Sequence, residues 1–529
     1  MTSTKHDLSE IYPRCRNLLD PAFWLRLTAS DDLGQNPGKI SEVLEAAGNH
    51  PHIPGFLSEL ARLEWNIFQT KGKSIPLPSD QEDEEINPTL LLLELQWKHL
   101  SAENLDNPGT QVPEPGNEYV LVWKHPEDGE VRVKTASPED FLTLKMISER
   151  IDRKEIARTG GLPIRAVDDA MDRAIQGGIV IAPPSRIRRH FDIVEEAPYA
   201  KKQFLVSPSF TLQWHITQAC DLHCKHCYDR SDRTALPLEQ GLKIMDDLDT
   251  FCRERRVRGQ ICFTGGNPLL HPDFLSLYKE ASDRGFTLII LGNPSTRKQI
   301  ETILSVQKPD FFQISLEGLP EHNDFIRGKG HFQKSMGFLE ILCELGVYSM
   351  VMLTLTNENI NQVLPLAELL QGKADIFYFN RLSKVGRGAG LDLPSKEEYI
   401  PFLERYVDAC EKYPVLGLKD NLINILNHRK GTDPFGGCTG FGCGAAFNFL
   451  AVLADGEVHA CRKFPSPIGN IYQQRIAEIY DSETAQRYRS GSEECRSCPL
   501  RPVCGGCLAS AYSHGLDIFE KKDPYCFIK

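Results

Sequence analysis

The sequence predicts an α/β protein whose central part is a parallel sheet, closed or partly closed into a barrel. Short apolar runs alternate with amphipathic helical segments over residues 208–412, and repeated strand–helix units require parallel strands. Six such units occur, fewer than the eight of a complete TIM barrel. We therefore expect a partial (β/α)6 barrel, preceded by regions at 1–117 and 118–184 and followed by a cysteine-rich domain at 413–529.

Composition and charge exclude several classes of protein. The 529 residues are 41% hydrophobic and 25% charged, as in ordinary globular proteins. A net charge of −12 argues against general nucleic-acid binding. No apolar run approaches the roughly 18 residues of a membrane helix, and the N-terminus lacks a secretory signal. We expect a cytoplasmic protein that binds neither nucleic acid nor membrane.

The first two regions differ in their predicted secondary structure. Residues 1–117 are expected to be a helical region, with apolar residues at helical spacing through Phe56–Phe68 and a solvated linker at 79–87. Residues 118–184 predict a small α+β domain. Its strands are expected at Tyr119–Lys124, Val131–Lys134 and Ile179–Ala182, its helices at Phe141–Ile151 and Ile164–Ile175, and a linker follows at 183–198.

In the barrel region, ligand sites are expected where the strands end, because parallel strands present their carboxyl ends at one edge. Representative helices are predicted at Leu238–Arg255 and Phe332–Leu345. The six strands are expected at Phe210–Thr217, Gln260–Gly265, Thr287–Gly292, Phe311–Gly318, Tyr348–Leu355 and Ile376–Leu382.

Cys220, Cys224 and Cys227 follow the first of these strands at C-x3-C-x2-C spacing. Three thiolates on one short loop can converge on a soft metal centre, which favours an iron–sulfur cluster, zinc or copper(I). Three ligands would leave one iron of a four-iron cluster open to a small molecule. A zinc knuckle or three unrelated buried thiols are the alternatives.

Two later strand ends carry residues suited to ligand binding. The second strand ends at Gly265-Gly-Asn-Pro268, where glycines allow a close approach of the backbone. The fourth carries Ser315 and Glu317, followed by Arg327, whose guanidinium suits a carboxylate. On spacing alone, Glu317 and Arg327 could instead form a surface ion pair. Asn293 and Asn380 are weaker candidates.

The cysteine motif together with the glycine pair resembles the radical S-adenosylmethionine (SAM) superfamily. The resemblance implies that SAM chelates the open iron through its amino and carboxylate groups. It assigns the SAM amino group to Gly265, Gly266, Asn267 and Pro268. It places Ser315 and Glu317 at the ribose and Arg327 at the carboxylate.

Eight further cysteines begin at Cys438 and resemble the SPASM domain, which holds two auxiliary four-iron clusters. The resemblance implies that one cluster is ligated by Cys438, Cys443, Cys461 and Cys507, and the other by Cys495, Cys498, Cys504 and Cys526. Full ligation favours electron relay over substrate ligation. A pair of zinc ribbons is the alternative, because two C-x2-C pairs alone would fit a four-thiolate zinc site.

The whole pattern resembles radical SAM/SPASM enzymes that modify peptides, including the selenobiotic-family peptide maturases, and residues 118–184 resemble a winged-helix, leader-peptide recognition element. The resemblance implies reductive cleavage of SAM to a 5′-deoxyadenosyl radical and modification of a ribosomally made, cysteine-rich precursor peptide. An electron donor such as flavodoxin or ferredoxin would supply the reductant.

Two other functions remain open from the sequence. A sulfatase-type maturase shares the SPASM layout but typically has Asp directly after the Gly-x4-Cys cysteine, where this chain has Arg462 after Cys461. A catalytically silent peptide-binding partner with structural zinc is the second alternative.

Overall fold

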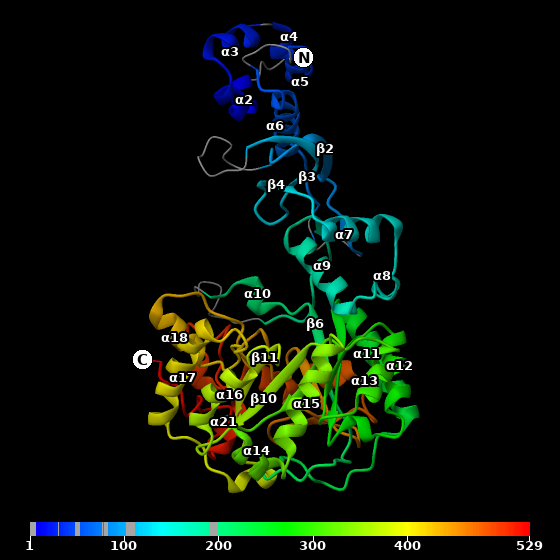
Figure 1. Cartoon of the computed structure of the whole chain (residues 1–529), viewed down its shortest axis with the longest axis vertical. Coiled ribbons are helices and arrows are strands. Elements are labelled where there is room, and N and C mark those ends of the chain that lie inside the picture. The colour runs from blue at the N-terminus through cyan, green and yellow to red at the C-terminus, as the bar shows by residue number, and fades with distance from the viewer. Residues whose placement is uncertain are drawn as a thin grey trace. The chain divides into compact units, whose positions relative to one another are not determined.

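The computed structural model describes residues 7–29, 31–47, 53–76, 78, 83–101, 112–189 and 199–528. The chain divides into two compact units, which are described separately (Figure 1). The first unit comprises Met1–Gly160 and Ala166–Pro184, and the second comprises Gly161–Arg165 and Ser185–Lys529.

The first unit begins with helices, as predicted. Pro21 starts α3, where a proline fits because its missing N–H would be unpaired anyway, and Asp20 accepts hydrogen bonds from the first turn. One face of α6 is buried through Leu57, Leu60 and Leu63. The helices are α1 (Leu8–Ile11), α2 (Pro13–Leu18), α3 (Pro21–Thr28), α4 (Asp31–Gln35), α5 (Ile40–Ala46) and α6 (Leu57–Lys71).

An antiparallel sheet of order β2-β3-β4 follows in the same unit. Strands β3 (Glu114–Lys124) and β4 (Val131–Thr135) confirm two predicted strands. Strand β2 (Leu91–Lys98) was not predicted, so the expectation of a helical region over 1–117 is wrong here. Its alternation of buried Leu93 and Leu95 with exposed Glu94 and Gln96 is the period-2 signal of a half-buried strand.

Helices α7 (Pro138–Glu149), α8 (Arg153–Gly160) and α9 (Ile164–Gln176) follow. Short strands β1 (Glu85–Ile86) and β5 (Val180–Ile181) pair antiparallel. Asn87 is buried, and its amide donates to Lys124 O and Gly178 O. The expected solvated linker is therefore wrong for residues 85–87, while 79–82 lie outside the described residues.

The second unit is built on a nine-stranded sheet of order β11-β10-β9-β8-β7-β6-β12-β13-β14. The first six strands in chain order are parallel and confirm the six predicted strands: β6 (Ser209–Thr217), β7 (Arg258–Gly265), β8 (Thr287–Leu291), β9 (Phe312–Ser315), β10 (Ser349–Leu355) and β11 (Ile376–Arg381).

Crossover helices connect these strands, as parallel pairing requires, and surround the sheet in Figure 1. They are α11 (Leu238–Arg255), α12 (Phe274–Asp283), α13 (Arg297–Leu304), α14 (Pro320–Arg327), α15 (His331–Glu344) and α16 (Val363–Leu370), with α17 (Lys396–Lys412) after the last strand. The prediction of a helix at Leu238–Arg255 is confirmed.

The C-terminal residues extend the same sheet, because β12 pairs in parallel with β6. One hydrophobic core runs through both parts of the unit, so the four-domain division of the chain stays a prediction. The elements here are α18 (Ile423–Lys430), β12 (Phe449–Val452), β13 (Glu457–His459), β14 (Pro467–Asn470), α19 (Ile476–Asp481), α20 (Glu483–Ser490) and α21 (Leu508–Ser513).

The predicted linker over 183–198 is packed in part. Ile187 is fully buried in the core of the second unit, and its carbonyl accepts a hydrogen bond from Ser207 N. Residues 190–198 lie outside the described residues. The short helix α10 (Lys202–Leu205) leads into β6.

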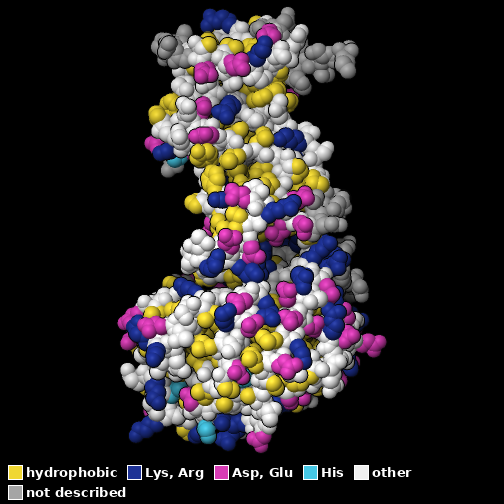
Figure 2. Space-filling model, turned by 90° about the vertical axis from the view of Figure 1, so that its right-hand side faces the viewer, with side chains coloured by type: hydrophobic (Ala, Val, Ile, Leu, Met, Phe, Trp, Pro, Cys, Tyr) yellow, Lys and Arg dark blue, Asp and Glu magenta, His cyan; other side chains and the backbone are white. Residues whose placement is uncertain are grey.

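The surface carries both signs of charge. On the face drawn in Figure 2, Lys and Arg side chains are interspersed with Asp and Glu over the second unit, which agrees with the net charge of −12. No helix in the described ranges is both long and apolar enough to cross a lipid bilayer.

Candidate functional site

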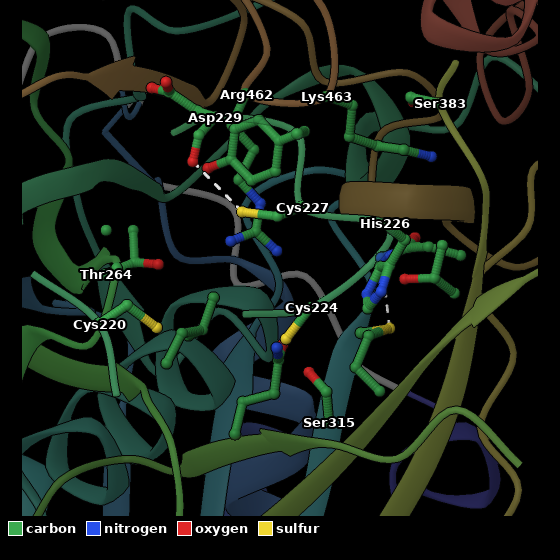
Figure 3. A pocket seen from close by; sticks show the side chains of 18 of the residues that line it. Cys220, Cys224, His226, Cys227, Asp229, Thr264, Ser315, Ser383, Arg462 and Lys463 are labelled. Atoms are coloured by element: carbon green, nitrogen blue, oxygen red, sulfur yellow. Dashed lines mark hydrogen bonds between the residues drawn. The ribbon is translucent and has the colours of Figure 1, made fainter. Parts of the chain in front are cut away.

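The three cysteines of the C-x3-C-x2-C motif lie at one cavity of about 230 Å³. They belong to the loop between β6 and α11, at the carboxyl ends of the parallel strands, and Figure 3 shows them with Thr264 and Ser315 around the pocket. Cys224 is buried. Burial raises the pKa of its thiol, while the nearby charge of Arg327 acts in the opposite direction.

Two glycines let the cysteine loop lie against the end of β7. Gly266 N donates to Thr217 O at 2.8 Å, and Asn267 N donates to Ala219 O at 2.7 Å. A Cβ atom on Gly265 would lie 2.2 Å from Thr217 O, and one on Gly266 would lie 2.2 Å from Ala219 O. Gly265 also has φ +131°, which other residues rarely adopt. The glycine pair is therefore required for the loop's position.

Asp221 fixes the same loop from the other side. Its Oδ1 accepts hydrogen bonds from Asn293 Nδ2 at 2.6 Å and from Asn267 Nδ2 at 3.1 Å. Asn293 Nδ2 also lies 3.5 Å from Cys220 Sγ. Asp221 was not predicted from the sequence, although a carboxylate next to the first cysteine was a signal.

The four residues of the Gly265–Pro268 motif do not all face the cavity. Gly265 and Gly266 line the cavity, whereas the side chains of Asn267 and Pro268 do not. Asn267 is buried, and its Oδ1 accepts a hydrogen bond from Leu269 N. Both ends of that amide are engaged within the protein, so Asn267 holds the loop rather than facing the cavity.

Glu317 and Arg327 form a buried ion pair beside Cys224. Arg327 lines the cavity and approaches Cys224 Sγ at 3.8 Å, but Glu317 does not line it. Glu317 Oε1 lies 3.2 Å from His226 Nε2, and Oε2 accepts a hydrogen bond from Thr354 N. Burial alone would raise the pKa of Glu317, but His226 and Arg327 outweigh it and hold that pKa well below its ordinary value.

Of the residues that the resemblance implied for SAM binding, only some therefore line the cavity. Ser315 and Arg327 line it, together with Gln313 and Thr354, which were not predicted from the sequence. Glu317 is turned away and instead orients Arg327. Such a pairing was visible in the sequence only as a possible surface contact.

The eight C-terminal cysteines surround two further cavities. The second cavity is lined by Cys438, Cys443, Cys461 and Cys507. The third is lined by Cys495, Cys498, Cys504 and Cys526. These are the two sets that the SPASM resemblance implied, and each contains thiols from distant parts of the chain.

The chemistry of these donors fits clusters better than single ions. Among the described residues, no three His, Cys, Asp or Glu side chains lie close enough to share one metal ion. Zinc would require four sulfurs at about 2.3 Å from one centre, whereas a four-iron cluster occupies space between its thiolates. Each set of four thiols lines one cavity, so the four sulfurs of a set border a common space, as ligation of a cluster requires.

The second cysteine-lined cavity adjoins both of the others. The first and second cavities share the lining residues Asn380, Arg381 and Lys463. The second and third share Gly506. Arg381 is buried and donates to Asp523 Oδ1 and Oδ2 at 2.8 and 2.7 Å, and to Asp420 Oδ2 at 2.8 Å. Its guanidinium thus joins β11 to the C-terminal segment that holds the third site.

Two family models match the chain. The radical SAM superfamily matches residues 214–370, and the SPASM iron–sulfur cluster-binding domain matches residues 443–499. The first match contains the C-x3-C-x2-C loop and the second contains four of the eight C-terminal cysteines.

Three curated relatives illustrate the range of similar proteins. The AdoMet-dependent heme synthase of Methanosarcina barkeri is 25% identical over 60% of this chain and 96% of its own length. The antilisterial bacteriocin subtilosin biosynthesis protein AlbA of Bacillus subtilis is 26% identical over 56% of this chain and 66% of its own. The mycofactocin maturase MftC of Mycolicibacterium smegmatis is 28% identical over 63% and 87%.

Among solved structures, Streptococcus suis SuiB is similar with a TM-score of 0.49 at 16% identity, covering 78% of this chain and 96% of its own. The family matches carry the assignment of the cofactors, namely SAM, a [4Fe-4S] cluster and auxiliary iron–sulfur clusters. The chain therefore carries a radical SAM domain and a SPASM iron–sulfur cluster-binding domain, as radical SAM/SPASM enzymes do.

Proposed function

We propose that this enzyme modifies a ribosomally synthesised precursor peptide. The observation that carries the proposal is the combination, in one chain, of three cysteine-lined cavities in series with a small sheet whose strand β4 has one open edge among the described residues. The first feature suits radical chemistry with electron relay, and the second suits capture of an extended peptide.

In this proposal Cys220, Cys224 and Cys227 ligate the cluster that binds SAM. Arg327 faces the SAM carboxylate, because a buried guanidinium held by Glu317 is pre-oriented for such a group. Ser315 faces the ribose. With its cofactors bound, the site supplies a 5′-deoxyadenosyl radical that abstracts hydrogen from the substrate.

The C-terminal cysteines are proposed to hold the two auxiliary clusters in the sets that line the second and third cavities. Each cluster would then be ligated by four protein thiolates, which leaves no iron open to substrate. Electron transfer is their proposed role, and a flavodoxin or ferredoxin is the proposed donor.

The peptide is proposed to bind the first unit by strand addition. Within the described residues, β4 pairs only with β3 and so has an open edge, whereas the outer edge of β2 is partly occupied, because Gln96 N donates to Glu59 Oε2 and Glu94 O accepts from Arg62 Nη1. Backbone hydrogen bonds to an added strand give affinity, and pockets for alternate side chains give specificity. Relatives named for bacteriocin biosynthesis and for mycofactocin maturation support a peptide.

A porphyrin substrate is the second candidate, because three of the relatives are named AdoMet-dependent heme synthases. The M. barkeri protein is matched over 96% of its length by only 60% of this chain. This chain therefore has residues for which that relative has no counterpart, and these residues favour an additional recognition function.

A direct experiment separates the two candidates. The full-length chain is reconstituted anaerobically with iron and sulfide and then incubated with SAM, a reductant, and either a short peptide encoded beside its gene or Fe-coproporphyrin III. A peptide mass change with matching 5′-deoxyadenosine is expected. Conversion of the porphyrin with no change in any co-expressed peptide would overturn the proposal.

Removal of the first unit tests the recognition step. The cut belongs after residue 184, because Ile187 packs in the core of the second unit, and it also removes the short segment Gly161–Arg165 of that unit. The shortened chain is expected to cleave SAM without modifying the peptide. Undiminished modification of the full precursor by this chain would contradict strand addition to the first unit.

A further inference from the structure

The wall of the first cavity formed by β11 and the C-terminal segment carries positive charge that no cofactor contact above uses. Arg462 and Lys463 follow Cys461 and line the cavity, as does Ser383 after β11. Figure 3 shows these three residues on the side of the pocket away from Cys220 and Ser315.

Most charged side chains around this cavity already have partners. Arg327 is paired with Glu317, and Arg381 with Asp420 and Asp523. Asp229 is the only carboxylate among the lining residues that the structure describes.

Asp229 is also satisfied from within the protein. Its Oδ1 accepts a hydrogen bond from Ser231 N, and its Oδ2 accepts from Gln218 Nε2 and Arg233 Nη1. It therefore does not neutralise the opposite wall of the cavity.

Arg462 and Lys463 differ from these pairs. Neither side chain has an ion pair or hydrogen-bond partner within the described part of the chain. Ser383 is 9% exposed, and its Oγ is a buried hydroxyl without a hydrogen-bond partner. A buried polar group left unpaired is costly, so such a group at a cavity wall suits a ligand that supplies the missing partner.

We propose that Arg462, Lys463 and Ser383 form a carboxylate subsite for the substrate, so that the reacting residue carries or adjoins an acidic side chain or the C-terminal carboxylate. Two cations and one hydroxyl match the acceptor oxygens of a carboxylate, and a guanidinium can bind it through two hydrogen bonds. The inference rests on the proposed peptide function and specifies the substrate of that same site.

The position of Arg462 supports this role. Arg462 lines the cavity, and its side chain is only partly exposed. Lys463 lines the second cavity as well. A carboxylate bound between them would hold the substrate between the SAM site and the first auxiliary site.

Two other roles for this charge are distinguishable. The same cations could bind the carboxylate of SAM, or they could offset the negative charge of the cluster thiolates. The test therefore measures substrate-like probes, SAM and the auxiliary cluster separately.

The experiment uses the reconstituted full-length chain with saturating SAM and three small probes, measured by titration calorimetry. N-acetyl-glutamate α-amide carries only a side-chain carboxylate, N-acetyl-glutamine carries only an α-carboxylate, and N-acetyl-glutamine α-amide is neutral. One of the two acids is expected to bind about tenfold or more tightly than the neutral probe, which identifies the source of the carboxylate.

The substitutions Arg462→Gln and Lys463→Gln should each weaken the binding of that acidic probe by about tenfold to a hundredfold, as loss of a charge-assisted hydrogen bond predicts. Arg230→Gln is the matched control, because Arg230 lines the same cavity but is exposed and donates to Leu222 O. Its effect should be about threefold or less. The affinity for SAM should not change in the Arg462 and Lys463 variants.

Three results would each overturn the subsite. Equal binding of all three probes would remove the carboxylate preference. A loss of SAM affinity in place of probe affinity would assign the cations to SAM. A shifted auxiliary-cluster potential with unchanged probe binding would assign them to the cluster. None of these results bears on whether a peptide is modified, so the proposed function stands or falls on its own assay.

Discussion

The carboxylate of Glu317 accepts two hydrogen bonds from the guanidinium of Arg327 through one oxygen, Oε1, from Nε at 2.8 Å and Nη2 at 2.6 Å. Both side chains are buried, at 2% and 10% exposure. The other carboxylate oxygen accepts from Thr354 N on the neighbouring strand. Glu317 therefore holds the guanidinium of Arg327 beside Cys224, although Glu317 itself does not line the cavity.

Glu317→Gln is expected to destabilise the protein by about 3–5 kcal/mol, because it leaves a buried guanidinium without its counter-charge. Glu358→Gln is the matched control, since Glu358 is 59% exposed near His322 and should change stability by at most about 0.5 kcal/mol. Chemical denaturation measures both variants. Equal stability of the two would show that the ion pair does not hold this part of the fold.

Gly266→Ala is expected to disrupt the cysteine loop while leaving the barrel folded. The added methyl group would meet two carbonyl oxygens, Ala219 O at 2.2 Å and Gln218 O at 2.6 Å, which belong to backbone and cannot rotate away. We expect loss of about four irons per chain and of SAM cleavage, measured by iron analysis and 5′-deoxyadenosine formation.

Gly337→Ala provides the control for that variant. Gly337 lies within α15, and nothing is found within 4 Å of its added Cβ. Alanine there should keep the iron and stabilise the helix by up to about 1 kcal/mol. Full iron content in Gly266→Ala would contradict the role given to the glycine pair.

Local patterns predicted the scaffold well because each strand carries its own signal. The six barrel strands are short apolar runs that end at polar or glycine residues, and all six form. Strand β2 was missed because its apolar start at residues 90–93 hides the alternation that follows. The two sets of C-terminal cysteines were predicted from the resemblance to the SPASM domain, by matching the cysteines in their order along the chain.

The interior contacts of the site could not be predicted in the same way. Asp221 is held by Asn267 and Asn293, which come from two other strand ends, and no spacing along the chain shows that they meet. The resemblance to the radical SAM superfamily implied Glu317 at the ribose, but side-chain direction decides whether such a residue faces the cavity or the core. Only the fold supplies that direction.

The two cysteine sets predict a specific pattern of iron loss. Cys438→Ala and Cys495→Ala should each reduce the wild-type content of about twelve irons per chain by about four. A second substitution in the same set, Cys443→Ala with Cys438→Ala, should remove no more iron, whereas Cys438→Ala with Cys495→Ala should remove about eight. Iron analysis of anaerobically purified protein measures this.

Cys343→Ala is the control, because Cys343 is exposed on α15 and belongs to neither set. Its iron content should equal that of the wild type. If Cys438→Ala and Cys495→Ala together lost only as much iron as either alone, the two sets would ligate one cluster and the assignment would be wrong.

The buried His331 predicts a pH dependence of stability. Burial lowers the pKa of His331 to about 4, and the charge of Arg327 acts in the same direction. The residue begins α15, where the helix dipole also disfavours a cation. Its Nδ1 lies 3.2 Å from Asn323 Nδ2, and Asn323 Oδ1 accepts a hydrogen bond from Glu317 N. Neutral His331 can accept from Asn323, whereas protonated His331 cannot.

Because the pKa of His331 is lower in the folded state than in the unfolded state, its contribution to stability is fully present above about pH 6.5 and is lost as the pH falls towards about 4. The loss should reach about 3 kcal/mol over that range. His331→Gln removes this dependence, while His514→Gln, at an exposed histidine, should retain it. Urea unfolding at several pH values measures the differences, and parallel pH curves for wild type and His331→Gln would show that His331 does not carry the effect.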